Sequence, residues 1–151
     1  MASNNIHIVV IFSCDTGAVE QLALAAAVGA VQARADIRLR RVVNPGEAAF
    51  AGTERLDQDY IAPREADAAW ADGFVLAARG PFHSHFFNAI HALGGLAGKP
   101  VLFLCGDQAD ESVKNANVIS DVEVVNVDRE GALLAGRRVA ETSRARQGSS
   151  L

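Results

Sequence analysis

Blocks of apolar residues alternate with alanine-rich and polar stretches along the chain. Residues 6–13 are nearly all β-branched or aliphatic, which is typical of a parallel strand buried on both faces. Residues 18–34 are rich in alanine and predict a helix with side chains small enough to pack closely against a sheet. Further strands are predicted at 36–43, 73–78, 101–105 and 123–127, and further helices at 64–71, 84–93, 109–116 and 129–146.

The regular alternation of strands and helices predicts the fold class. Five strands that alternate with helices give a three-layer αβα sandwich around a parallel sheet. We expect a single domain over residues 1–151, because no linker and no internal repeat is visible. Residues 44–63 carry Pro, Gly, Thr and Asp without a sustained period and predict a long loop.

Composition narrows the class of protein. Half of the 151 residues are hydrophobic and 21% are charged, which excludes a disordered chain. The net charge of −4 gives no electrostatic reason to expect nucleic acid as a partner. The arginines near the end of the second strand and along the last helix are interpreted as solvated faces: Arg40, Arg41, Arg137, Arg138, Arg144 and Arg146.

The cysteines and the N-terminal residues bear on the compartment. Cys14 and Cys105 are too few for a disulfide framework, and their spacing fits no zinc motif. No Lys or Arg precedes the first apolar run and no small-residue cleavage site follows it, unlike a secretory signal. No uninterrupted run of about 18 apolar residues is present, so no membrane span is predicted. We therefore expect a cytoplasmic protein.

Residues 14–20, Cys-Asp-Thr-Gly-Ala-Val-Glu, are the strongest candidate for a binding site. They connect a buried strand to a helix N-terminus, where unpaired backbone amides and the helix dipole favour an anion. The segment resembles the flavin-phosphate loop of flavodoxins, Ser/Thr-x-Thr-Gly-Asn-Thr-Glu, through Thr16, Gly17 and Glu20. The departures from that form are Cys14, Ala18 and Val19.

Three other families with the same order of elements fit the strand ends less well. A receiver domain needs an aspartate after strand three, where Ala77 and Ala78 stand. A low-molecular-weight phosphatase needs an arginine where Glu20 stands, and a carboxylate there would repel phosphate. A dinucleotide-binding Rossmann unit needs Gly-x-Gly-x-x-Gly after strand one, and only Gly17 is present.

A further resemblance is to NAD(P)H:quinone oxidoreductases of the WrbA type. Residues 71–77, Ala-Asp-Gly-Phe-Val-Leu-Ala, resemble the third strand of that family, and Phe82 is in register with the segment that wraps its flavin. Residues 136–141, Gly-Arg-Arg-Val-Ala-Glu, resemble its closing helix. The long insertion that the family carries after strand four is missing here.

These resemblances imply a flavodoxin-like sheet of order 2-1-3-4-5 with flavin mononucleotide (FMN) at its carboxyl edge. They imply an oxidoreductase or electron-transfer protein that passes electrons from NAD(P)H to a quinone or a redox partner, with no metal and with no side chain required to act as an acid or a base. The alternative is a flavodoxin-fold protein that has lost its cofactor and acts as a binding or structural subunit. The predicted cofactor-binding residues are Ser13, Cys14, Asp15, Thr16, Gly17, Ala18, Val19, Ala78, Arg79, Gly80, Pro81, Phe82, His83, Cys105, Gly106 and Asp107.

Residues 82–87, Phe-His-Ser-His-Phe-Phe, are the densest cluster of aromatic side chains and histidines in the chain. We expect Phe82 to lie against the flavin, because aromatic faces stack on such rings. Without the insertion these apolar side chains are left uncovered, so we also expect a homo-oligomer that associates through this side of the molecule. His7 lies in the first strand and is predicted to be a core histidine.

Overall fold

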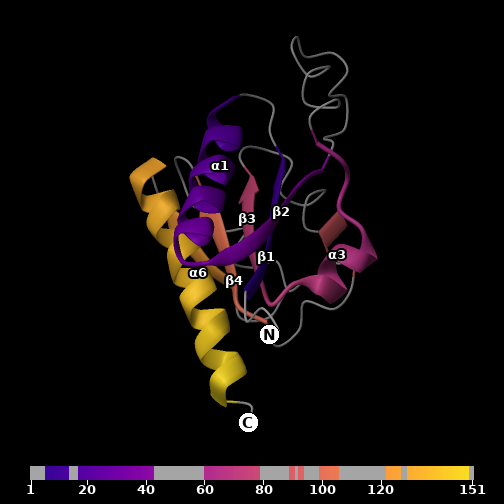
Figure 1. The fold of residues 1–151 in the computed structure, drawn as a ribbon. Helices are drawn as coiled ribbons and strands as arrows, with labels where there is room; N and C mark the ends of the chain where they lie inside the picture. Colours follow the sequence, from indigo (N-terminus) through magenta and orange to yellow (C-terminus); the bar gives the residue numbers. More distant parts are fainter. Residues whose placement is uncertain are drawn as a thin grey trace.

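The fold is that of an open parallel sheet between two layers of helices (Figure 1). The computed structural model describes residues 6–13, 17–42, 60–78, 89–90, 92–93, 99–105, 122–126 and 129–149. Their helices and strands are β1 (Ile6–Ser13), α1 (Gly17–Gln32), β2 (Ala35–Arg41), α3 (Glu65–Trp70), β3 (Gly73–Ala78), β4 (Val101–Cys105), β5 (Val122–Asn126) and α6 (Arg129–Ser149).

The sheet has five strands in the order β2-β1-β3-β4-β5, and every neighbouring pair is parallel. This confirms the predicted fold class and strand order. From β1 the chain first adds β2 on one side of the strand and then adds β3 on its other side. The direction in which strands are added therefore reverses between β1 and β3. Ligands of open α/β sheets bind at such a reversal, outside the carboxyl ends of the strands.

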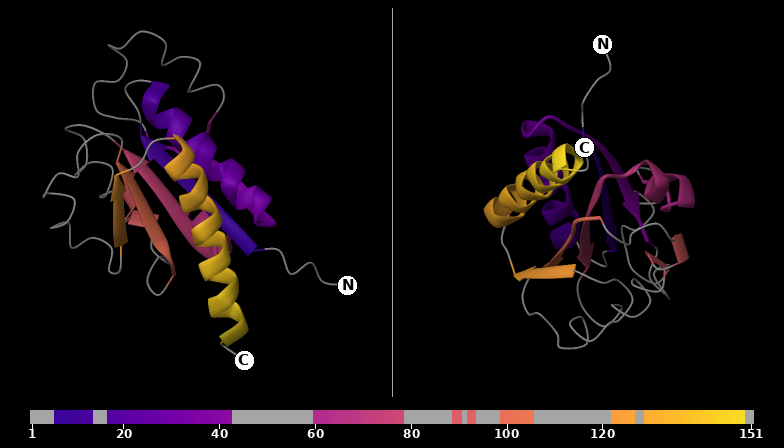
Figure 2. Two further views of the ribbon diagram at one scale, coloured as in Figure 1. Left: turned by 90° about the vertical axis from the view of Figure 1, so that its left-hand side faces the viewer. Right: turned by 90° about the horizontal axis from the view of Figure 1, so that it is seen from below.

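Helices cover both faces of the sheet, as the two views of Figure 2 show. On one face α1 and α6 pack over the even-numbered residues of β1, such as Ile8 and Val10. On the other face α3 and Ile90 pack near the odd-numbered residues, such as Val9 and Ile11. The first strand is therefore buried on both sides, as its continuous apolar run predicts. None of the described helices is both long and apolar enough to cross a membrane.

The helices α1 and α6 touch through their backbones. A Cβ atom placed on Gly29 would lie 1.8 Å from the carbonyl oxygen of Leu133. A Cβ atom on Gly136 would lie 1.9 Å from the carbonyl oxygen of Ala26. Only glycine fits at these two positions, and the alanines of α1 fill the space between this contact and the sheet.

The predicted boundaries differ from the observed ones at several ends. The first helix stops at Gln32 rather than at residue 34, because Arg34 adopts a left-handed conformation (φ 67°) that turns the chain into β2. The last strand begins one residue earlier than predicted, because Val122 pairs with Val101, the first residue of β4. The last helix extends three residues further, to Ser149. The predicted helix 109–116, most of 84–93 and most of the loop 44–63 lie outside the described residues.

Candidate functional site

The carboxyl edge of the sheet brings together the ends of three strands predicted to carry the site. Ser13 ends β1 and is in register with Ala78, which ends β3. Cys105 ends β4, the next strand along, and is in register with Asn126 of β5. The first turn of α1 lies at the same edge, at the top of Figure 1. The strand ends therefore converge as the sequence predicts.

Most of the predicted cofactor-binding residues lie outside the elements whose strand ends meet at this edge. The backbones of Gly17, Ala18, Ala78 and Cys105 are part of described elements. The following residues lie outside the described part of the chain: Cys14, Asp15, Thr16, Arg79, Gly80, Pro81, Phe82, His83, Gly106 and Asp107. Their assignment to a flavin site stays a prediction.

The first residues of α1 have backbone amides that are available to a ligand. Gly17, Ala18 and Val19 begin the helix, so their N–H groups have no carbonyl partner within it. The side chain of Val19 is 0% exposed and belongs to the core between α1 and the sheet. Val19 can therefore serve a ligand only through its backbone amide. The replacement of the flavodoxin threonine by Val19 therefore changes the packing of the core and does not remove a side-chain donor to the ligand.

A buried arginine lies at the end of β2. Arg41 is 2% exposed and is in register with Phe12, which places it on the face that α1 covers. The amide of Val42 donates to the carbonyl oxygen of Phe12 at 2.9 Å, which fixes this end of β2 beside β1. The interpretation of Arg40 and Arg41 as a solvated face is therefore wrong. A buried positive charge on the α1 side of this edge favours an anion there.

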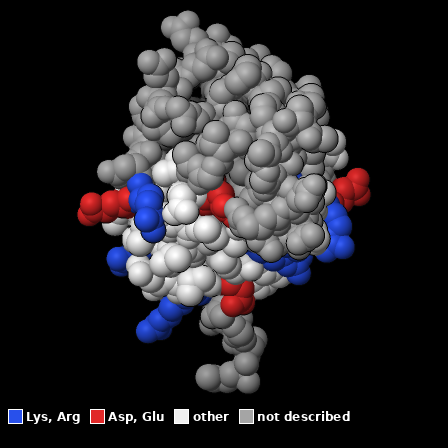
Figure 3. Space-filling view, turned by 90° about the horizontal axis from the view of Figure 1, so that it is seen from above, with Lys and Arg blue, Asp and Glu red and all other residues white. Residues whose placement is uncertain are grey.

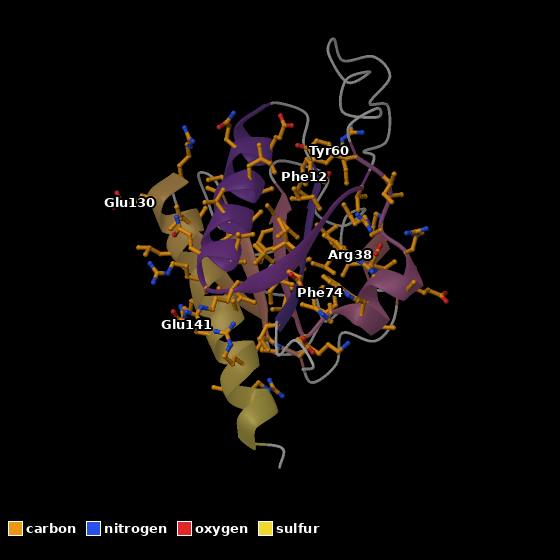
Figure 4. All side chains as sticks on the ribbon, viewed as in Figure 1. Phe12, Arg38, Tyr60, Phe74, Glu130 and Glu141 are labelled. Carbon is orange, nitrogen blue, oxygen red and sulfur yellow. The ribbon has the colours of Figure 1, made fainter. Side chains whose placement is uncertain are left out.

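A buried carboxylate lies in the first turn of α1. Glu20 is 6% exposed, and the hydroxyl of Tyr60 donates a hydrogen bond of 2.8 Å to its Oε2. The Tyr60 ring meets the Phe12 ring edge to face, with centroids 4.8 Å apart. Both side chains are labelled in Figure 4. The next residue, Ile61, accepts a hydrogen bond from the Arg41 amide at 3.0 Å. The chain thus returns to β2 at Tyr60 and covers the edge of the sheet next to α1.

Removing the Tyr60 hydroxyl tests this contact. We expect Tyr60→Phe to lower the free energy of unfolding by about 1–3 kcal/mol, because the buried Glu20 carboxylate loses a hydrogen bond and gains no water. Urea denaturation measures the change. In a double-mutant cycle with Glu20→Gln the two effects should not add. Additive effects would show that the two side chains do not interact in solution.

A second polar cluster lies on the α3 face, away from the predicted flavin site. The Asp67 carboxylate is 0% exposed and accepts hydrogen bonds from Arg38 at 3.0 Å and from Arg40 at 2.9 and 3.1 Å. The Arg64 amide donates a further bond of 2.9 Å. Burial by itself raises the pKa of Asp67, but the hydrogen bonds from Arg40, Arg64 and Arg38 outweigh it and hold the pKa below its usual range. The cluster ties α3 to β2.

His7 lies at the amino end of β1, beside this cluster. Its ring stacks on Trp70 with centroids 4.3 Å apart and an interplanar angle of 7°. Arg38 lies over the same indole, 4.2 Å from the ring centroid. The His7 side chain is 36% exposed, so the prediction of a core histidine is wrong. Within the described ranges no three His, Cys, Asp or Glu side chains form a group that could hold a metal ion.

Comparison with known proteins places the fold. No family model and no curated protein sequence matches the chain. A diflavin flavoprotein A3 from Nostoc sp. has a TM-score of 0.62 at 13% identity, covering 97% of this chain and 99% of that chain. A flavodoxin from the domain Archaea has a TM-score of 0.59 at 12% identity, with 92% and 99% covered. A third structure, from Bacteroides eggerthii, has a TM-score of 0.54 at 14% identity, with 91% and 99% covered.

These similarities span nearly the whole of each chain, and they agree with the strand order and the layers described above. The TM-scores establish the architecture. Sequence identities this low do not distinguish a WrbA-type subfamily. The chain has the flavodoxin-like α/β fold.

Proposed function

We propose that the chain binds FMN at the carboxyl edge of its sheet. The observation that carries the proposal is the start of α1 at the reversal of strand order, where three helix amides without helical partners meet the end of β1. Solved structures with the same fold include proteins named as flavoproteins and a flavodoxin, which supports a flavin as the ligand. The loop that follows β1 resembles a flavin-phosphate loop in three residues.

The described residues fit a phosphate monoester at this place. The amides of Gly17, Ala18 and Val19 are the donors, and the dipole of α1 adds positive potential. Arg41 brings a buried positive charge to the same face of the sheet. The Glu20 carboxylate accepts a hydrogen bond from Tyr60, and a glutamate also stands at this position of the flavodoxin loop that the segment resembles. We assign the flavin ring to the loops after β3 and β4, which include Phe82 and Gly106.

The redox role follows from the ligand. Bound FMN supplies one- and two-electron transfer at its ring, so no side chain of this chain has to act as an acid or a base. We propose NAD(P)H as the donor and a quinone or a redox protein as the acceptor. The support for these partners is the resemblance of residues 71–77 and 136–141 to quinone oxidoreductases.

A flavin titration tests the proposal. We expect FMN fluorescence to be quenched on addition of the apoprotein, with a dissociation constant in the micromolar range. Riboflavin lacks the phosphate and should bind more weakly. Ala18→Asn restores the asparagine of the resembled loop and should tighten FMN binding about tenfold, since a hydrogen bond to a charged acceptor contributes about 1.5–3 kcal/mol.

Val19→Thr is the matched control for this titration. It also restores a loop residue, but its side chain would lie in the core, so it should cost stability and leave FMN affinity unchanged. Failure of both the parent protein and Ala18→Asn to bind FMN at millimolar concentration would contradict the proposal. That result would favour the second candidate, a flavodoxin-fold subunit without a cofactor. The substitution of three residues in the phosphate loop is the observation behind this candidate.

A further inference from the structure

The outward face of α1 carries no charged side chain. From Val19 to Gln32, the part of α1 whose side chains the structure describes, the exposed side chains are those of Gln21, Leu24, Val28, Val31 and Gln32. Leu24, Val28 and Val31 are 36%, 49% and 52% exposed, and their spacing puts them in one row along the helix. The opposite face of α1 packs on the sheet, so the helix is apolar on both sides. A surface helix of a monomeric domain normally has a polar outward face.

The helix α6 extends this apolar surface. Leu133 lines a groove of about 380 Å³ together with Leu24 and Val28 of α1, and Gln21, Ala25, Arg129 and Glu130 line the rest of it. Leu134, the next residue of α6, is 56% exposed. In both views of Figure 2, no described element lies outside α1 and α6 on the side away from the sheet. Figure 3 shows an uncharged area below the centre of the molecule, with charged side chains at its edges. We call the five residues Leu24, Val28, Val31, Leu133 and Leu134 the α1–α6 patch.

The charged side chains beside this patch favour a second copy of the same chain as the partner that covers it. Glu130 precedes Leu134 by about one helical turn, and Arg137 follows it by about one turn. Both side chains are exposed. If a second α6 crosses in the antiparallel direction at Leu134, Glu130 of each copy lies opposite the exposed pair Arg137 and Arg138 of the other. The patch is therefore complementary to itself in charge.

The same crossing suits α1. Gly29 lies against the carbonyl group of Leu133, so its neighbour Val28 lies level with the centre of the crossing. Leu24 and Val31 lie about one turn before and after Val28. A single two-fold axis that runs across both helices at the level of Val28 and Leu134 therefore packs α1 on α1 and α6 on α6 of the second copy. Such an interface is isologous, so a single patch is sufficient to build it.

We propose that the chain forms a two-fold symmetric dimer through the α1–α6 patch. The helix α1 has 16 residues, so two helices of this length side by side present a face of roughly 480 Å². This is just below the roughly 500 Å² per partner at the small end of specific interfaces, so we expect a weak dimer. The patch lies on the face opposite α3, so the dimer does not depend on flavin binding. It also differs from association through Phe82.

Light scattering coupled to size exclusion, from micromolar to submillimolar protein, measures the oligomeric state of the full chain with and without FMN. We expect twice the chain mass of 15.9 kDa. Val28→Asp should give a monomer, because it buries a carboxylate against its own copy. Glu130→Arg alone and Arg137→Glu alone should each raise the dissociation constant roughly tenfold. The double variant restores both pairs and should recover the parental value.

Glu65→Arg is the matched control, since it makes the same charge change at an exposed position of α3, and it should leave the dimer intact. Circular dichroism and urea denaturation show whether Val28→Asp stays folded, and the charge swap keeps the test valid if it does not. A parent protein that stays monomeric at every concentration overturns the proposal. So does a dimer that is insensitive to the swap, or one that Phe82→Asp dissociates while Val28→Asp does not.

Discussion

Asp67→Asn is expected to lower the free energy of unfolding by about 3–5 kcal/mol, the usual cost of removing one partner from a buried ion pair. The carboxylate is 0% exposed and bridges two arginines of β2, and an amide leaves both guanidinium groups without their negative partner. Urea denaturation at neutral pH measures the loss. Glu65→Gln, in the same short helix but exposed, should change stability by less than about 0.5 kcal/mol.

The stability contributed by Asp67 should also depend on pH. Because its pKa is lower in the folded than in the unfolded protein, the contribution is fully present above about pH 4 and is lost as the pH falls through the folded pKa. The stability of Asp67→Asn should therefore fall less steeply in acid than that of the parent. Parallel pH profiles for the two proteins would show that the carboxylate is not held by the arginines in solution.

Gly136→Ala and Gly29→Ala are expected to lower the free energy of unfolding by about 3 kcal/mol each, at the upper end of overpacking costs. Each added methyl group would lie within 2 Å of a carbonyl oxygen of the facing helix, at 1.9 Å and 1.8 Å respectively. No rotamer change can relieve a clash between a Cβ atom and backbone, so α1 and α6 must move apart. Alanine favours an isolated helix over glycine by about 1 kcal/mol, so a net loss shows that the clash dominates.

The control for these variants is Glu141→Ala, an exposed position on α6 where stability should change by less than about 0.5 kcal/mol. Thermal unfolding followed by circular dichroism gives the three values under one set of conditions. An unchanged or raised melting temperature for Gly136→Ala would mean that the two helices do not touch as described.

The fold was predictable from sequence because its strongest signals are local. The apolar run that forms β1 and the alanine-rich run that forms α1 each fall within two residues of the observed element. β3 and β4 were predicted at their observed bounds, because Gly73 and Pro100 mark their starts. The end of α1 was missed, because a non-glycine residue, Arg34, adopts the turn conformation that glycine usually provides.

The candidate site was predictable only where it depends on backbone geometry. The amides at the start of α1 follow from a strand, a turn and a helix in sequence order. The contact of Tyr60 with Glu20 joins residues 40 positions apart, and no local pattern indicates it. Arg41 looked like half of a solvated pair, because the alternation of β2 does not reveal that a helix covers one of its faces.

The hydrogen bond from the Arg41 amide to the Ile61 carbonyl joins the two ends of the segment between β2 and α3. Since the ends are fixed to the framework, the entropic cost of closing this segment grows only with the logarithm of its length. The segment is therefore a natural place to graft a loop of another length or sequence. A library built between Val42 and Tyr60 should leave the sheet and its helices unchanged, because the bonds that anchor both ends, Arg41 to Ile61 and Val42 to Phe12, lie outside the replaced residues.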